Sequence, residues 1–352
     1  MDLSALGWKK YSESVSLPEG SFDVGRISVE NKTNYTVLTK YGECAGILRG
    51  KTLSGFDGAE FPKVGDWVRI AKLPEENKVI VEEILPRSTK ISRKSPEGDE
   101  EQVIVANVDV VFIVQGLPDD FNLRRLERYL VIARQSGAKP VVILNKIDLN
   151  DDFYELISEA RAVAQEAPII AVSAKTGKGI DELKTFLQPG STFVLLGSSG
   201  VGKSSLVNAI TGESLQTTRE IREYDGRGRH TTTKREMIIL EDGSILIDTP
   251  GMRELALWAD EEEIQKSYED VEELSLSCRY SNCDHEKSDG CAVKAALDDG
   301  TLSQERYQNY LKMKKEAEYL ETKFNKTKQM ERKTQAKKQH KKLNKTLKEK
   351  YG

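Results

Sequence analysis

The sequence predicts a multidomain protein with an N-terminal β-barrel, a central α/β domain and a C-terminal α-helical domain. Three observations support this fold class. Short alternating strands fill residues 21–87, nearly continuous apolar strands alternate with helices over 108–251, and three cysteines and one histidine lie within fourteen positions. The first pattern is typical of a small barrel, the second of a parallel or mixed sheet, and the third of a metal site.

Length and composition exclude several classes of protein. The 352 residues suit two or three domains, which bury a core without disulfides. Four cysteines are too few for a disulfide scaffold, and no apolar run approaches the roughly 18 residues of a membrane span. The N-terminal residues contain no apolar stretch of the signal-peptide kind. We therefore expect a cytoplasmic, monomeric protein without membrane contact.

The charges are distributed unevenly along the chain. The net charge is -4, but residues 303–352 carry 16 basic and 6 acidic side chains, and residues 1–302 carry 37 basic and 51 acidic ones. A basic tail on an acidic body favours contact with a polyanion such as a nucleic acid. The alternative is a solvated helix.

The first 95 residues divide into an extension and a barrel. Residues 1–20 form the N-terminal extension, with one helix expected around Leu3–Trp8. Five strands are predicted within 21–95, at 22–30, 35–42, 44–50, 64–71 and 78–85. Five strands in so few residues imply a closed barrel. The size fits the oligonucleotide/oligosaccharide-binding (OB) fold, although periodicity alone does not separate it from an SH3-like barrel.

The central domain is expected over 96–260, after a polar linker at 88–102. Strands are predicted at 108–116, 139–145, 168–174, 191–197, 237–240 and 244–251. Helices are predicted at 123–136, 151–166 and 179–187, with another starting near Lys203. Beyond it we expect a zinc-binding domain over 261–302 and a basic helical tail over 303–352.

A phosphate-binding loop is the strongest motif. Residues 197–204, GSSGVGKS, match G-x-x-x-x-G-K-[ST] between an apolar strand and a helix. Backbone N–H groups and the helix N-terminus suit phosphates, Lys203 should reach the β- and γ-phosphates, and Ser204 should bind Mg²⁺. The predicted phosphate-binding residues are Gly197, Ser198, Ser199, Gly200, Val201, Gly202, Lys203, Ser204 and Ser205.

Two further loops predict that the nucleotide is GTP or GDP. Asp148, in the sequence NKID after a strand, can accept both N1–H and N2–H of guanine, which adenine does not offer. Asp148 therefore argues against the alternative that the protein is an ATPase. Asn145 can bond the base edge and the loops, and the Lys146 stem can cover the ring. Ser173, Ala174 and Lys175 end another strand and can present a backbone N–H to guanine O6.

The segment between the phosphate-binding loop and DTPG (248–251) has the composition of a switch loop. Asp248 can hold Mg²⁺ through water and the Gly251 N–H can meet the γ-phosphate. Thr232 is the favoured Mg²⁺ ligand, with Thr231 and Thr233 open. Met252 stands where many GTPases carry a water-orienting Gln, so His230 is the candidate catalytic group; the alternative is that His230 binds a partner.

These motifs occur in a rotated order. NKID and the serine–alanine–lysine loop precede the phosphate-binding loop and DTPG, whereas the base-reading loops usually come last. The central domain is therefore predicted to be a circularly permuted P-loop GTPase domain, because permutation is feasible where the original termini lie close together.

A third group of residues predicts one structural zinc ion. Cys278, Cys283, His285 and Cys291 supply three thiolates and one imidazole, which suits a closed tetrahedral site. Their surroundings are too polar for free core cysteines. Cys44 lies in a predicted strand and is interpreted as packing.

Together these motifs resemble the ribosome small-subunit-dependent GTPase A family of circularly permuted bacterial GTPases. The resemblance implies an OB barrel, a permuted GTPase domain and a zinc domain. It also implies action late in maturation of the small (30S) ribosomal subunit, binding to ribosomal RNA, and faster GTP hydrolysis on the subunit. It places the catalytic histidine at His230, and it places an apolar residue, Met252, where other GTPases carry the water-orienting Gln.

Other interpretations remain open at this stage. The protein could be a nucleotide-gated RNA-binding clamp with incidental turnover, or a diverged paralogue with another RNA partner. Two RNA surfaces are plausible on charge and aromatic content. The barrel offers Tyr35, Tyr41, Arg49 and Lys51, and the tail offers Lys337, Lys338, Lys341 and Lys342.

Overall fold

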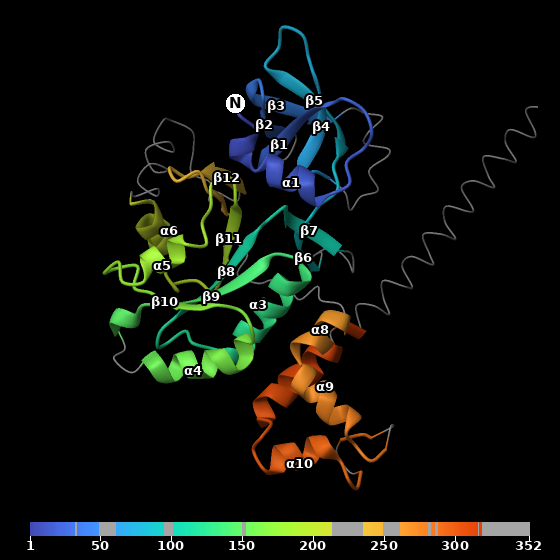
Figure 1. Ribbon diagram of the computed structural model, residues 1–352, viewed down its shortest axis with the longest axis vertical. Coiled ribbons are helices and arrows are strands. Elements are labelled where there is room, and N and C mark those ends of the chain that lie inside the picture. The colour runs from blue at the N-terminus through green and yellow to red at the C-terminus, as the bar shows by residue number, and fades with distance from the viewer. Residues whose placement is uncertain are drawn as a thin grey trace, which may run out of the picture. The chain divides into compact units, whose positions relative to one another are not determined.

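The computed structural model describes residues 1–31, 34–48, 61–94, 101–149, 153–212, 235–248, 261–280, 283–285, 288–315 and 317–318. These residues form two compact units (Figure 1). The first contains the N-terminal segment, the barrel and the α/β domain. The second contains the C-terminal helices and the cysteine cluster.

Five strands close the barrel: β1 (Asp23–Glu30), β2 (Tyr35–Thr39), β3 (Gly42–Leu48), β4 (Trp67–Lys72) and β5 (Lys78–Ile84). The sheet order is β1-β2-β3-β5-β4, and β4 pairs back onto β1. Strands β3 and β5 run parallel, and the other pairs are antiparallel. This closed order is that of a five-stranded OB-type barrel, so topology decides what periodicity left open.

The N-terminal segment packs as part of the first unit. The expected helix around Leu3–Trp8 is instead a 3-10 turn, η1 (Ser4–Leu6), followed by helix α1 (Trp8–Ser14). Gly7 separates them because its φ of 84° is left-handed and interrupts a right-handed helix. Leu6 and Tyr11 are buried.

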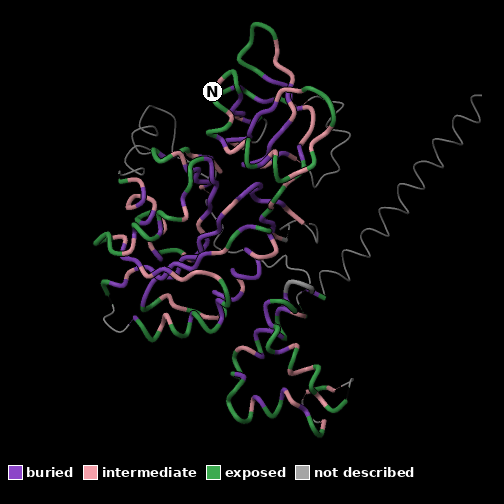
Figure 2. The backbone as a smooth tube through the Cα atoms, viewed as in Figure 1, coloured by how far each residue is buried: buried purple, intermediate pink, exposed green. Residues whose placement is uncertain are grey.

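In the part of the α/β domain that the structure describes there are six strands: β8 (Val110–Gly116), β9 (Lys139–Asn145), β10 (Ile169–Ala171), β11 (Thr192–Leu196), β12 (Glu236–Ile239) and β13 (Ile245–Asp248). Their order is β10-β9-β8-β11-β13-β12. The first five are parallel, and β12 is antiparallel to β13. Strand β8 is buried along its whole length (Figure 2), as its continuous apolar sequence requires.

Within the described residues, four helices accompany this sheet: α3 (Leu123–Gln135), α4 (Phe153–Ala164), α5 (Ile180–Lys184) and α6 (Lys203–Thr211). Helices α3 and α4 pack on each other and on the β8, β9 and β10 side of the sheet. Helices α5 and α6 place Leu183 and Leu206 in one core with Phe112 and Phe193. The predicted alternation of strands and helices is therefore confirmed.

The sheet continues from the α/β domain into the barrel. Strand β12 pairs antiparallel with β1, where Val29 lies opposite Glu236. The predicted linker at 88–102 is wrong in part, since β6 (Lys90–Lys94) and β7 (Glu101–Ala106) form a two-stranded sheet. The polar residues between the two strands give the segment the composition of a linker, although Ile91 of β6 and residues 103–106 of β7 are buried.

Arg26 of β1 is a buried hydrogen-bond centre where these parts meet. Its side chain donates to the backbone oxygens of Leu6, Gly65 and Asn107 and to Thr192 Oγ1, at 2.6–3.3 Å. Arg26 is 2% exposed, and its guanidinium lies 5.3 Å from the centre of the Trp67 ring. Burial lowers its pKa to about 10, so it stays charged at neutral pH.

The second unit is helical. It contains α8 (Glu261–Ser267), α9 (Glu269–Leu276), α10 (Ala292–Asp298) and a helical segment at 304–315. Tyr268 is buried, accepts a bond from Asn309 and lies under the Arg306 guanidinium. In the part of the chain that the structure describes, no helix is long and apolar enough to cross a membrane.

We predict that Arg26→Met lowers the free energy of unfolding by about 3 kcal/mol or more, because buried carbonyls lose a charged donor. The control is Arg69→Met, which removes a half-exposed arginine of β4 paired with Glu82 and Glu83. That pair is at the surface and should cost about 1 kcal/mol or less. Urea unfolding of both variants measures this difference, and equal losses would contradict a junction role for Arg26.

Candidate functional site

The predicted nucleotide-binding loops lie at one edge of the α/β sheet. Asn145 ends β9, Ser173 follows β10, and Gly197 follows β11. These strands are parallel, so their carboxyl ends meet at the same edge. The order in which successive strands are added to the sheet reverses between β8 and β11, since β9 and β10 lie on one side of β8 and β11 lies on the other. Such a switch point is where open α/β sheets bind ligands.

The phosphate-binding loop joins β11 to α6. Lys203 is the first residue of α6, and its Nζ donates to the carbonyl of Gly197 at 2.7 Å and to that of Ser198. The ammonium group is therefore held at the centre of the loop. Ser204 and Ser205 are exposed in the first turn of α6, where their hydroxyls can reach a ligand at the helix N-terminus.

Asn145 connects the phosphate-binding loop to the loop after β10. Its Nδ2 donates to the Val201 carbonyl at 2.8 Å, and its Oδ1 accepts from the Ala174 N–H at 3.1 Å. Asn145 is 1% exposed. Both ends of the carboxamide thus hold backbone atoms of the two loops, which fixes the position of one loop relative to the other.

Two glycines permit this close packing. A Cβ on Gly202 would lie 2.3 Å from Asn145 Nδ2, and the φ of 95° at Gly202 is left-handed. A Cβ on Gly116 would lie 3.2 Å from Val201 Cα and 3.4 Å from Lys146 Cε. The Lys146 side chain therefore passes over the end of β8, beside the phosphate-binding loop. Lys146 has a φ of 68°, a conformation that costs a non-glycine residue about 1–3 kcal/mol.

Asp148 is held as an exposed carboxylate beside Ser173. The Ser173 hydroxyl donates to Asp148 Oδ1 at 2.6 Å, and this bond is the main reason that the pKa of Asp148 lies below its usual value. Lys175 and Lys146 lower that pKa further. Ser173 is fully buried, which fixes the direction of its hydroxyl. Asp148 can therefore accept hydrogen bonds from two adjacent N–H donors at any pH near neutral.

Several predicted residues fall outside the described residues. They are His230, Thr231, Thr232, Thr233, Gly251 and Met252, with Arg49 and Lys51 of the barrel and Lys337, Lys338, Lys341 and Lys342 of the tail. Asp248 is described: it ends β13 and is partly exposed. Tyr41 is 47% exposed. Tyr35 corrects an expectation, because it is 8% exposed within the barrel core and has no ring face for an RNA base.

The predicted metal ligands converge in the second unit. The ligand atoms of Cys278, Cys283, His285 and Cys291 all lie within 4.8 Å of one another. The Sγ atoms of Cys278 and Cys291 are 3.9 Å apart, and His285 Nδ1 is 3.6 Å and 3.5 Å from them. A tetrahedral zinc ion requires about 3.8 Å between sulfurs and about 3.6 Å from sulfur to nitrogen. The donor set and its spacing therefore fit zinc.

The local backbone shapes this cluster. The His285 N–H lowers the pKa of the Cys283 thiol, which favours the thiolate that a metal needs. Burial raises the pKa of the Cys291 thiol. Cys291 also caps α10, because its Sγ accepts from the Lys294 N–H at 3.3 Å. The four donors leave no coordination position for a substrate, as in structural zinc sites.

Sequence reasoning missed Gly116, and it expected Asn145 to bond the loops without identifying Val201 and Ala174 as its partners. Gly116 ends the apolar strand β8, and a glycine at the carboxyl end of a buried parallel strand is a usable signal of close backbone approach. The Asn145–Val201 bond joins residues 56 positions apart. No local pattern reveals such a contact.

Comparison with protein families gives two matches. The RsgA GTPase family model matches residues 84–258, which include every predicted nucleotide-binding residue. An ABC transporter model matches residues 180–350. That second match includes the phosphate-binding loop, a motif that many nucleotide-binding proteins share, and it leaves out Asp148 and Ser173.

Curated relatives align with most of the chain. A protein from Opitutus terrae named small ribosomal subunit biogenesis GTPase RsgA is 42% identical, over 91% of this chain and 90% of its own. Small ribosomal subunit biogenesis GTPase RsgA 1 of Listeria innocua is 41% identical over 91% and 90%.

Solved structures agree in fold. YjeQ from Thermotoga maritima has a TM-score of 0.62 and 29% identity, over 84% of this chain and 99% of its own. YloQ, described as a circularly permuted GTPase, has a TM-score of 0.58 and 24% identity, over 87% and 97%. The rotated motif order is thus a circular permutation of the GTPase fold, and the chain belongs to the RsgA GTPase family.

Proposed function

We propose that this protein binds the small (30S) ribosomal subunit, hydrolyses GTP there faster than in solution, and assists late maturation of the subunit. The observation that carries the proposal is the joining of a guanine-type carboxylate loop to a phosphate-binding loop through Asn145. The names of the curated relatives, small ribosomal subunit biogenesis GTPases, support the choice of partner.

The nucleotide is GTP or GDP, held at both ends. Asp148 accepts N1–H and N2–H of guanine, and the loop of Ser173, Ala174 and Lys175 presents a backbone N–H to O6. The loop 197–205 surrounds the phosphates, and the Lys203 ammonium, already held at the centre of that loop, neutralises them. The Lys146 stem covers the base.

Magnesium completes the phosphate site. Ser204 and Thr232 are the proposed direct ligands, with Asp248 acting through water, and these hard oxygen donors suit the ion. When bound, Mg²⁺ neutralises charge that develops on the phosphates. The exposure of Ser204 in the first turn of α6 supports its part in this site.

Hydrolysis requires an oriented water, which Met252 is unable to hold. We assign this task to His230 and expect a slow free enzyme. Binding to the subunit would then accelerate hydrolysis through the 226–233 segment, which carries His230 in its sequence. The alternative, a nucleotide-gated RNA clamp with incidental turnover, predicts no such acceleration.

The zinc cluster would hold the second unit together. One zinc ion on Cys278, Cys283, His285 and Cys291 would fix the turn before α10, because Cys291 both binds the ion and caps that helix. Ribosomal RNA is the proposed contact of the barrel and of the basic tail, and we propose that the protein acts as a cytoplasmic monomer.

The GTP hydrolysis rate should rise by at least tenfold when purified small subunits are added, at one fixed salt concentration. Large subunits at the same concentration are the control for general RNA effects. His230→Ala should abolish the rise while leaving GDP affinity within twofold. No rise with small subunits, with GTP binding intact, would contradict the proposal and favour the clamp or another RNA partner.

Asp148→Asn should change the base preference of the site. An amide side chain offers N–H in place of one acceptor, so affinity for GTP should fall by at least tenfold relative to xanthosine triphosphate. Competition binding against a labelled guanine nucleotide measures this ratio. Asp181→Asn, in the first turn of α5, is the control for loss of one carboxylate at the surface. An unchanged ratio in Asp148→Asn would refute the assignment of Asp148.

A further inference from the structure

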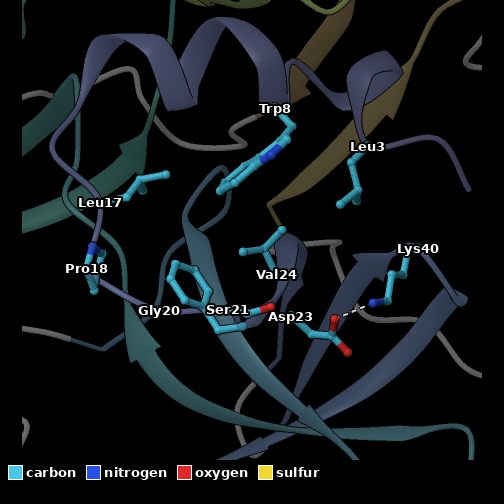
Figure 3. Close-up of a pocket in the computed structure, with 10 residues that line it drawn as sticks. Leu3, Trp8, Leu17, Pro18, Gly20, Ser21, Asp23, Val24 and Lys40 are labelled. Atoms are coloured by element: carbon cyan, nitrogen blue, oxygen red, sulfur yellow. Dashed lines mark hydrogen bonds and ion pairs between the residues drawn. The ribbon is translucent and has the colours of Figure 1, made fainter.

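A cavity of about 410 Å³ lies between the N-terminal segment and the barrel, and we call it the barrel cavity. It shares no residue with the nucleotide loops. Its walls are apolar, with Leu3, Trp8, Leu17, Pro18 and Val24 among them. Figure 3 shows the Trp8 side chain projecting from α1 between Leu17 and Leu3, above Val24.

The Trp8 ring is held firmly. It meets the buried Trp67 ring edge-on with 4.9 Å between ring centres, and it lies 5.6 Å from the ring of Tyr11. Tyr11 is itself anchored, since its hydroxyl donates to the Pro86 carbonyl at 2.6 Å. Trp8 remains partly exposed. A flat apolar surface fixed in advance binds a flat ligand without the entropy cost of ordering a side chain.

One lysine lines the cavity, and a second lies near it beside the Tyr41 ring. Lys40 lines the cavity and is ion-paired with Asp23, as Figure 3 shows. Lys40 Nζ lies 5.1 Å and Lys72 Nζ 6.0 Å from the centre of the neighbouring Tyr41 ring. The Lys40 side chain is 51% exposed. Trp8 and Lys40 thus line the same cavity, and Lys40 and Lys72 both lie beside the Tyr41 ring. Aromatic rings next to ammonium groups are the combination that single-stranded nucleic acid needs.

We propose that the barrel cavity takes one unstacked base of a single-stranded RNA segment. Trp8 stacks on the base, the apolar wall covers its other side, and Lys40 and Lys72 contact neighbouring phosphates. An apolar side chain of a protein would also match the wall but would offer no anion to Lys40 or Lys72, whereas a phosphate can join Asp23 as a partner of the half-exposed Lys40 ammonium. This inference rests on the proposed function, in which RNA of the small subunit is the partner.

The test compares two probes of equal length and backbone charge. One is a fluorescent ten-nucleotide oligouridine, and the other is the same sugar–phosphate chain without bases. At one fixed salt concentration, the full-length protein should bind the first about tenfold more tightly, because stacking contributes only there. Trp8→Leu should remove that difference while leaving affinity for the baseless chain within twofold.

The matched control is Tyr154→Leu. Tyr154 is an aromatic residue of α4 that is 72% exposed and does not line the cavity. This variant should keep the tenfold difference between the probes. Thermal unfolding of both variants identifies any general loss of structure.

A second variant tests the cations without touching the aromatic wall. Lys40→Gln should weaken both probes equally and should reduce the slope of log affinity against log salt by about 0.7. Lys184→Gln, an exposed lysine of α5, should leave the slope unchanged. These expectations hold even if Trp8→Leu does not fold.

Two results would overturn the base-binding inference. Equal wild-type affinity for the two probes is one. The other is loss of subunit stimulation in Trp8→Leu with no change in either probe affinity, which would assign the cavity to a protein partner. Stimulation of the wild-type enzyme by small subunits would survive both results. Its absence would instead refute the proposed function.

Discussion

The buried carboxamide of Asn145 holds the two parts of the nucleotide site in one arrangement. It donates to Val201 and accepts from Ala174, so the loops after β9, β10 and β11 are bonded to one another. This constraint explains why the rotated motif order is harmless. Parallel strands deliver the loops to one edge regardless of which strand comes first, and a single hydrogen-bonded side chain then fixes their spacing. Gly202 and Gly116 supply the room that this packing needs.

The barrel is attached to the α/β domain by more than its chain connection. Strand β1 extends the sheet beyond β12, and Arg26 bonds the N-terminal turn, the segment before β4, the end of β7 and the start of β11. The same guanidinium lies against Trp67, and Trp67 supports Trp8. Side-chain contacts thus run from Trp8 in the cavity wall through Trp67 and Arg26 to Thr192. Thr192 is the first residue of β11, the strand that leads to the phosphate-binding loop. These contacts fix the position of the barrel relative to the GTPase domain within the first unit.

Much of the fold could be predicted from the sequence because its patterns of apolar and polar residues are clear. Alternation marked the barrel strands, and continuous apolar runs marked β8, β9 and β11. The failures have physical causes. The strands β6 and β7 flank a polar stretch of sequence, Gly7 breaks the expected first helix, and Tyr35 is turned into the barrel core. In the sequence, Arg26 looks like an exposed residue of an alternating strand. It is buried because it bonds carbonyl groups of residues that are distant in the sequence. The metal ligands were found from spacing because all four lie within one short segment.

The most direct test of the site is the affinity of Asn145→Ala for GDP in the presence of Mg²⁺, measured by isothermal titration calorimetry. Loss of two buried hydrogen bonds between the loops should weaken binding by about thirtyfold or more. Asn122→Ala is the matched control: it removes the cap of α3, at a similar cost in stability, without touching either loop. A thirtyfold loss confined to Asn145→Ala would establish that this carboxamide assembles the site. Wild-type affinity in a folded Asn145→Ala protein would contradict it.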